Sequence, residues 1–170
     1  MKLLLIRHAP AEDALAWATA GRDDAERPLT EAGRQRMARI ASALARLEPE
    51  LDYILSSPLR RAVETAQILS SALPGEARIE LAPELAPGAD PWARIEKLVT
   101  SPPPSQRVAM VGHAPDLPLL AGRLLSGVPR AVLEFKKGGA ALFELGDRLD
   151  PHRTQLLWAI PPGVLRRAGS

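Results

Sequence analysis

The chain has 170 residues, 46% of them hydrophobic and 25% charged, which suits one domain with a packed core and excludes a disordered or fibrous chain. Because it contains no cysteine, a disulfide scaffold, a thiolate nucleophile and any cysteine-ligated metal site are excluded, and we expect a cytoplasmic protein. The 22 basic and 20 acidic residues leave a net charge of +2 without a long basic run, and no apolar run approaches a membrane span, so we expect neither nucleic-acid nor membrane binding.

Short apolar runs predict the β-strands of this chain. In chain order they cover residues 3–6, 53–55, 78–81, 108–111, 131–135, 140–145 and 155–160. The first is continuously apolar, which is typical of a strand buried on both faces. The sequence KKGG at residues 136–139 predicts a hairpin turn between the two runs that flank it.

Between these runs, apolar residues recur at helical spacing. Thr30 is a candidate N-cap for the first long helix. Ser57 is expected to cap the next helix, with Pro58 at its first position, because proline is favoured there. Two further helices are expected to begin near Pro91 and Pro115.

The alternation of strands and helices predicts an α/β fold. We expect a three-layer sandwich with a central, mainly parallel sheet, helices on both faces and one antiparallel edge. Residues 9–29 are expected to be mostly loop, and the prolines at residues 102–104 a rigid surface connection. One domain is expected over residues 1–160, followed by a mobile basic tail over residues 161–170.

Polar side chains follow three of the predicted strands. Arg7 and His8 follow the first strand, residues 57–61 follow the second, and Gly112 and His113 follow the fourth. Ligands of parallel sheets bind at the carboxyl ends of the strands, so we expect these three clusters to meet.

Two arginines and two histidines at such an edge would form a cationic pocket. The planar guanidinium matches phosphate oxygens in a bidentate way, and nearby helix N-termini favour the same guest. A histidine kept unprotonated by the surrounding positive charge can attack phosphorus while the cations hold the oxygens. No acidic cluster with metal-ligand character accompanies these residues, so we expect arginines in place of a metal ion and no cofactor.

Four segments of the chain resemble the histidine phosphatase superfamily, whose fold is that of phosphoglycerate mutase. Residues 4–9 (LLIRHA) resemble its Arg-His-Gly signature, residues 29–33 (LTEAG) its Leu-Thr-x-x-Gly helix start, residues 57–66 (SPLRRAVETA) its Ser-Pro-x-x-Arg-Ala-x-x-Thr-Ala segment, and residues 111–115 (VGHAP) its Gly-His-x-Pro segment. The likeness extends from about residue 3 to residue 160. Within the superfamily, the short chain and residues 27–30 and 83–90 are most similar to SixA-type phosphohistidine phosphatases.

This resemblance implies specific roles for the clustered residues. It implies that His8 is the nucleophile and carries the phosphohistidine intermediate, that Arg7 and Arg61 bind phosphoryl oxygens, and that His113 contacts and polarises them. Arg61 rather than Arg60 matches the superfamily arginine, because it directly precedes the alanine of that segment. Arg60 is expected to be a rim or surface charge.

The chain departs from the superfamily at three small residues. Ala11 and Ala14 stand where mutases and many small-molecule phosphatases carry Ser and Asn, so fewer side chains are available to bind phosphate. Ala9 stands in the place of glycine, which would strain the backbone if a positive φ were needed there.

The general acid for an ester substrate is open. Glu84, in the loop after the third strand, is a candidate, and its alternative is a solvated loop charge. Glu12 and Asp13 could also reach the mouth of the site. Asp90 and Asp116 are better explained as helix-start residues. A phosphohistidine releases imidazole, which needs less protonation than an alkoxide.

The sequence therefore predicts a metal-independent phosphatase that works through a phosphohistidine enzyme. The expected substrate is phosphohistidine on a signalling protein. The alternative is a small phosphorylated metabolite such as a sugar, nucleotide or cofactor phosphate. A third class, a non-catalytic phosphate-binding module, differs from both because it would show no turnover.

Overall fold

The computed structural model describes residues 1–75, 77–100 and 106–169. Within these residues the chain forms one mixed six-stranded sheet in the order β3-β2-β4-β1-β5-β6. The strands are β1 (Lys2–Arg7), β2 (Tyr53–Ser56), β3 (Arg78–Leu81), β4 (Arg107–Gly112), β5 (Ala140–Leu145) and β6 (Thr154–Ile160). The pairs β2–β3, β2–β4 and β1–β4 are parallel, whereas β1–β5 and β5–β6 are antiparallel.

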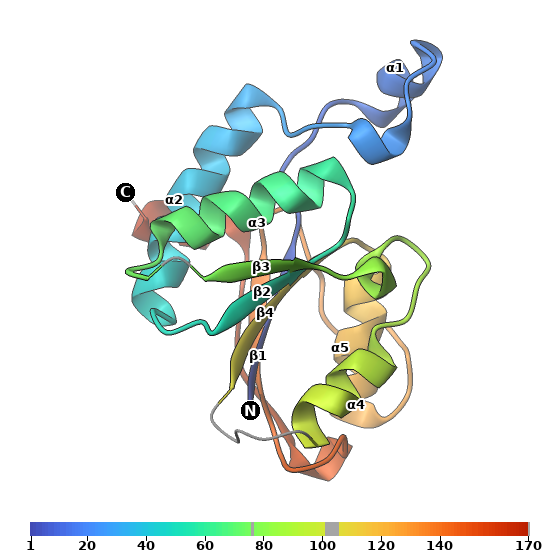
Figure 1. Ribbon diagram of the computed structural model, residues 1–170. Coiled ribbons are helices and arrows are strands. Elements are labelled where there is room, and N and C mark those ends of the chain that lie inside the picture. Colours follow the sequence, from blue (N-terminus) through green and yellow to red (C-terminus); the bar gives the residue numbers. More distant parts are fainter. Residues whose placement is uncertain (76, 101–105, 170) are drawn as a thin grey trace.

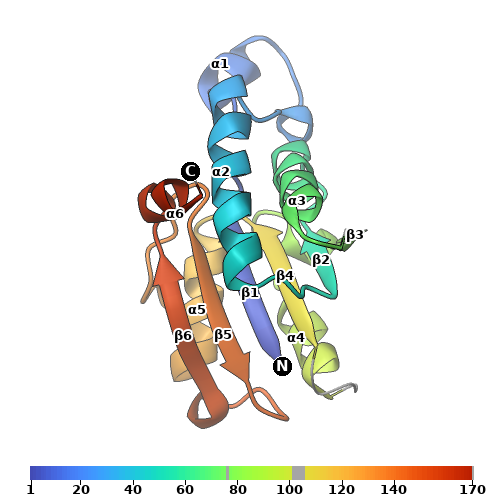
Figure 2. The ribbon, with the colours of Figure 1, turned by 90° about the vertical axis from the view of Figure 1, so that its left-hand side faces the viewer.

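Helices cover both faces of this sheet, which confirms the predicted three-layer α/β sandwich (Figures 1 and 2). One face carries α2 (Glu31–Leu47), α3 (Arg60–Ala72) and α6 (Pro162–Ala168), and the other carries α4 (Trp92–Thr100) and α5 (Asp116–Ser126). Strand β1 contributes side chains to the hydrophobic cores on both faces of the sheet. Leu4 and Ile6 belong to the core under α2 and α3, and Leu3 and Leu5 belong to the core under α4 and α5. Burial on both faces accounts for its continuous apolar sequence.

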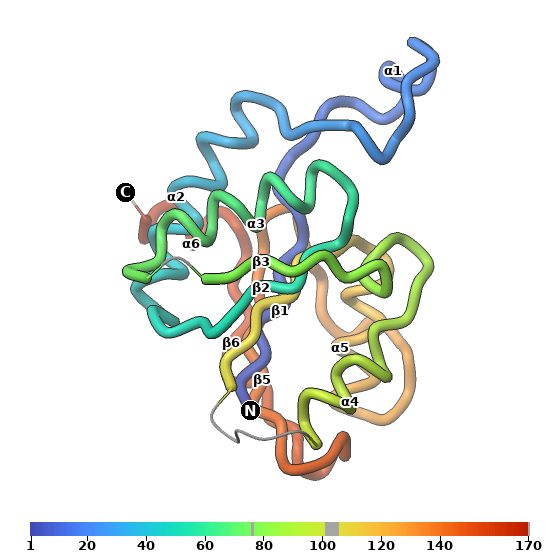
Figure 3. Tube along the Cα trace, viewed as in Figure 1, coloured from blue at the N-terminus to red at the C-terminus, as the bar shows by residue number. Residues whose placement is uncertain are grey.

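The segment between β1 and α2 extends away from the sheet (Figures 1 and 3). It contains the short helix α1 (Ala14–Thr19) and the 3₁₀ turn η1 (Asp24–Glu26), so the expectation of a loop over residues 9–29 is only partly correct. Asp13 and Asp23 begin these turns by accepting hydrogen bonds from Ala16 N–H and Ala25 N–H. Local caps of this kind leave no periodic apolar pattern in the sequence.

The predicted hairpin of residues 131–135 with residues 140–145 is wrong. Residues 131–135 form no strand, and β5 lies between β1 and β6 instead. The turn before β5 is bound to the end of β1, where Gly138 N–H donates to Arg7 O (3.0 Å) and Arg7 N–H donates to Gly139 O (3.1 Å). This turn directs β5 alongside β1, and β6 occupies the other edge of β5, so residues 131–135 find no free strand to pair with.

The C-terminal prediction also needs correction within residues 162–168. These residues form α6 rather than a mobile tail, and Leu165 is buried in the core that α2 and α3 cover. Pro162 at the first position of the helix and the buried Leu165 explain why these residues form a helix. The prolines at residues 102–104 lie outside the described residues. No helix in the described part of the chain is long and apolar enough to span a membrane.

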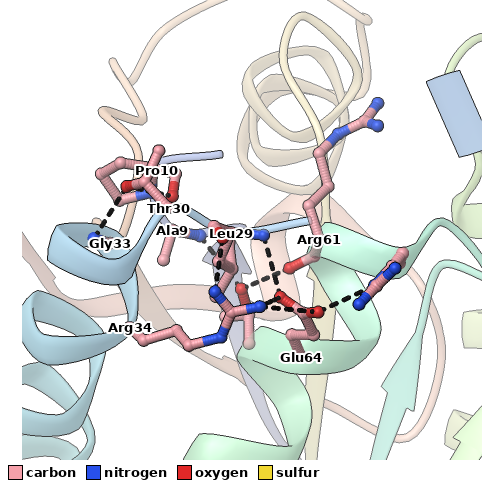
Figure 4. Close-up of polar contacts among 10 residues, drawn as sticks. Ala9, Pro10, Leu29, Thr30, Gly33, Arg34, Arg61 and Glu64 are labelled. Carbon is pink, nitrogen blue, oxygen red and sulfur yellow. Dashed lines mark hydrogen bonds and ion pairs between the residues drawn. The ribbon is translucent and has the colours of Figure 1, made fainter. Parts of the chain in front are cut away.

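Helix α2 begins against the loop that follows β1. Thr30 is its N-cap, as predicted, and the Thr30 hydroxyl accepts a hydrogen bond from Gly33 N–H (2.9 Å) while Thr30 N–H donates to Pro10 O (3.1 Å). A Cβ at Gly33 would lie 2.0 Å from Pro10 O, which no real side chain tolerates. Glycine therefore allows the first turn of α2 to contact the backbone next to Ala9 (Figure 4).

We predict that Gly33→Ala lowers the free energy of unfolding by about 2 kcal/mol, because the added methyl forces the helix away from the loop. Urea denaturation measures this. Gly163→Ala is the matched control: it also lies in the first turn of a helix, but a Cβ there meets no atom within 4 Å. Equal stability of the two variants would contradict this account of the contact.

Candidate active site

Two buried histidines follow adjacent parallel strands. In the β1–β4 register Arg7 lies opposite Gly112, so His8 and His113 leave the sheet at the same edge. His8 N–H donates to Gly112 O (3.0 Å), and the two imidazole rings lie with their centroids 5.1 Å apart and their planes at 53°. The sheet therefore brings together the first and third clusters of the sequence.

The main chain determines which nitrogen of His8 is free. Nδ1 lies 2.7 Å from Ala9 O, and a carbonyl oxygen only accepts hydrogen bonds. Nδ1 therefore carries the proton in this contact, and Nε2 keeps its lone pair. Ala9 is held in turn by Thr65, whose hydroxyl accepts from Ala9 N–H (3.1 Å) and donates to Arg61 O (2.7 Å).

Alanine in the place of glycine at position 9 strains nothing. Among the described residues, only glycines adopt a positive φ. Ala9 is fully buried within the core next to α2, so its methyl group is accommodated by packing.

Both histidines are neutral at neutral pH. The pKa of His8 is lowered to about 3, mainly by burial and also by its interactions with His113, Arg61 and Arg7, whereas the hydrogen bond to Ala9 O acts in the opposite direction. Burial, followed by the charge of Arg61, lowers the pKa of His113 to about 4. A neutral His8 with a free Nε2 has the electronic state that a nucleophile needs.

The guanidinium groups of Arg7 and Arg61 each donate a hydrogen bond to a main-chain carbonyl. Arg7 Nη1 donates to Phe135 O (2.7 Å), and Arg61 Nη1 donates to Asp24 O (2.9 Å). The Nε atom of each is buried and has no hydrogen-bond partner. A buried donor without an acceptor is costly, so these two atoms mark a position that suits an anion.

The structure distinguishes Arg61 from its neighbour Arg60. Arg61 is buried, whereas Arg60 is half exposed and pairs with Glu64 on its own helix (2.9 Å). The Glu64 carboxylate also accepts from Leu29 N–H (2.8 Å) and from Arg34 of α2 (3.0 Å), as Figure 4 shows. This network joins α2, α3 and the segment that enters α2.

Ser57 has a different position from the predicted helix cap. Helix α3 begins at Arg60, its N-cap Leu59 forms no side-chain cap, and Ser57 lies in the preceding loop. The Ser57 hydroxyl is fully buried, 2.8 Å from His113 Nε2. Ser57, which the sequence placed in the second cluster as a helix cap, and Thr65, to which the sequence assigned no part, are thus polar residues of the site. Their position directly after a strand, and one turn after Arg61, is the signal that could have identified them.

The candidate acid Glu84 lies in η2 (Pro83–Leu85), beside the site. It lines a small cavity that His113 also lines, and its carboxylate is 3.9 Å from Arg94 Nε. Asp13 is occupied as the cap of α1, and Asp90 caps α4 by accepting from Trp92 N–H (3.0 Å). Two carboxylate residues, Glu84 and Asp116, therefore line this cavity together with His113.

Comparison with known proteins identifies the family of this chain. A sequence model of the histidine phosphatase superfamily (branch 1) matches residues 3–86, which include Arg7, His8 and Arg61. The structure superimposes on the protein histidine phosphatase SixA complexed with tungstate with a TM-score of 0.79, at 25% identity, over 97% of this chain and 99% of that one. The chain belongs to the histidine phosphatase superfamily. It is a phosphatase with the phosphoglycerate mutase-like fold.

Two further solved structures and one sequence relative are also similar to this chain. A provisionally assigned phosphohistidine phosphatase SixA from Agrobacterium tumefaciens matches with a TM-score of 0.72 at 28% identity, over 94% of this chain and 96% of that chain. An uncharacterised protein of Picosynechococcus sp. is 35% identical over 142 residues, which cover 82% of each chain. A mycobacterial glucosyl-3-phosphoglycerate phosphatase shares the fold, with a TM-score of 0.64 at 19% identity, over 92% of this chain and 97% of that one.

The neutral histidines predict how stability depends on pH. Below about pH 6.5 the unfolded chain protonates these imidazoles, while the folded chain keeps them neutral down to about pH 4 for His113 and about pH 3 for His8. The unfolded state binds more protons, so the free energy of unfolding falls as pH decreases through this window. Each histidine contributes at most about 1.4 kcal/mol per pH unit.

Denaturation series from pH 7 to pH 4 measure this slope. We expect His113→Asn to reduce it by the share of one histidine, because asparagine does not titrate. Equal slopes in the parent and in the variant would contradict a neutral buried His113.

Proposed function

We propose that this phosphatase hydrolyses phosphohistidine on a signalling protein through a phosphohistidine intermediate at His8. The observation that carries the proposal is the buried, neutral His8 with a free Nε2, near two arginines whose buried Nε atoms have no partner. A nucleophile without charge and two cations with free donors suit the transfer of a dianionic phosphoryl group.

In the first step His8 Nε2 attacks phosphorus. The Nε2–P bond forms while the bond from phosphorus to the leaving nitrogen breaks, and the leaving imidazole takes a proton from solvent. In the second step water attacks phosphorus, the Nε2–P bond breaks, and inorganic phosphate leaves with the proton of the water. Arg7 and Arg61 hold the phosphoryl oxygens through their Nε edges, and His113 polarises these oxygens.

Three features support phosphohistidine as the substrate. Ala11 and Ala14 offer no side-chain hydrogen bond to a small phosphorylated metabolite. Residues 12–26 extend outward from the sheet and are largely exposed (Figure 1), so they offer a surface that a protein substrate could contact. Glu84 has a cationic neighbour in Arg94, and release of imidazole needs little help from an acid. The similarity to SixA supports the same substrate class.

The alternative substrate is a small phosphate monoester. The observation that favours it is the position of Glu84, which lines the same cavity as His113 and could donate a proton to an alkoxide. The fold shared with the glucosyl-3-phosphoglycerate phosphatase is compatible with this alternative.

We predict that Arg61→Lys lowers kcat/KM at least about 100-fold, because a lysine cannot offer two parallel donors to the phosphoryl group. Steady-state kinetics on p-nitrophenyl phosphate measure this. Arg60→Lys is the matched control: it makes the same change one residue earlier on the same helix, and activity should stay within about twofold of the parent. A larger loss in Arg60→Lys would overturn the assignment of Arg61.

We predict that kcat/KM in EDTA is at least about tenfold higher for a phosphohistidine protein domain than for a phosphoserine peptide or for sugar and nucleotide phosphates. His8→Ala should abolish turnover of all of them while circular dichroism shows an intact fold. Preference for a small ester would favour the alternative and make Glu84 the next residue to substitute. Loss of activity in EDTA that magnesium restores would refute the role of the arginines in place of a metal.

A further inference from the structure

Asp24 contacts Arg61 through both its side chain and its main chain. Arg61 Nη1 donates to Asp24 O (2.9 Å), and Arg61 Nη2 lies 3.0 Å from Asp24 Oδ2. These two contacts occupy the terminal edge of the guanidinium, which consists of Nη1 and Nη2. The side edge, Nε with the remaining N–H of Nη2, includes the buried Nε atom that has no partner.

Asp24 is itself held in place by the segment that follows His8. Its Oδ1 accepts from Arg27 Nε (2.7 Å), and Arg27 Nη1 donates to Glu12 O (2.7 Å). Arg27 is buried, whereas the Asp24 side chain is 56% exposed. A continuous series of polar contacts thus runs from Glu12 through Arg27 and Asp24 to Arg61, and it joins the outward-extending segment to α3.

We propose that Asp24 is a positioning residue for phosphoryl transfer, which holds the terminal edge of Arg61 so that the side edge faces the phosphoryl group. The proposal rests on the role proposed above for Arg61. Bidentate arginine contacts are directional, so the orientation of this guanidinium determines whether two donors meet the phosphoryl oxygens at once. The carboxylate also offsets part of the positive charge of the site, which favours release of the product phosphate.

These two effects predict that removal of the Asp24 carboxylate slows turnover but tightens the binding of phosphate. Without the Asp24 carboxylate, Arg61 turns toward any bound phosphate but no longer keeps the geometry that the transition state needs. We expect Asp24→Ala to lower kcat on p-nitrophenyl phosphate about tenfold, as misplacement of a catalytic contact does. Inorganic phosphate should bind up to about fivefold more tightly, because one half-exposed negative charge is gone.

Two further variants complete the experiment. Asp24→Asn retains one acceptor oxygen, so its kcat should lie between those of the parent and Asp24→Ala, with the same tightening of phosphate binding. Asp23→Asn is the matched control, because it removes the same charge one residue earlier and asparagine still caps the η1 turn. Its kcat and its dissociation constant for phosphate should stay within twofold of the parent.

Isothermal titration with inorganic phosphate and steady-state kinetics give both readouts. A kcat of Asp24→Ala within twofold of the parent would overturn the proposal, and so would weaker phosphate binding, which indicates a merely structural role. Effects of equal size in Asp23→Asn would also overturn it. If Asp24→Ala fails to fold, Asp24→Asn supplies the comparison. If the parent itself shows no phosphatase activity, the proposed function fails, while phosphate titration of Asp24→Asn against Asp23→Asn still tests the predicted tightening.

Discussion

The parallel pairing of β1 with β4 places two histidines at one edge of the sheet, and the chemistry of the site depends on this pairing. The backbone hydrogen bond from His8 to Gly112 O aligns the strand ends, and the loops that follow them bring the rings to 5.1 Å. Both rings are buried there, so burial is the first cause of their lowered pKa values. The same arrangement therefore supplies the geometry and the neutral state of the nucleophile.

Buried arginines next to these rings need acceptors, and main-chain carbonyls supply them. Arg7 binds Phe135 O and Arg61 binds Asp24 O, each through Nη1. Both carbonyls belong to segments without β-structure, one before the turn that enters β5 and one in η1. The loops thus hold the Nη1 atom of each guanidinium, whereas the buried Nε atoms have no hydrogen-bond partner. Fixed donors of this kind need no reorganisation when charge develops on a bound group.

Helix α3 supports the backbone of the loop that follows β1, and it also carries Arg61. Thr65 holds Ala9 N–H and the carbonyl of Arg61, while Glu64 on the adjacent position binds Leu29 N–H and Arg34 (Figure 4). Thr65 is fully buried and Glu64 lies near the surface, which is the arrangement that neighbouring positions of a helix produce. The turn of α3 that follows Arg61 is consequently held by contacts to the loop after β1, to the segment that enters α2 and to α2 itself.

The sequence alone determined the strands of the sheet, the start of α2 at Thr30, the α/β class and the superfamily, because apolar periodicity, caps and short motifs are local signals. It also indicated that Arg61, and not Arg60, faces the site. The tertiary structure decided the features that depend on contacts distant in the chain. Residues 131–135 do not form the predicted strand, because β6 pairs with β5 in their place. Residues 162–168 form a helix, because Leu165 packs into the core that α2 and α3 cover. Ser57 lies against His113 rather than at a helix start, and Asp24 lies on Arg61, since both contacts join segments that only folding brings together.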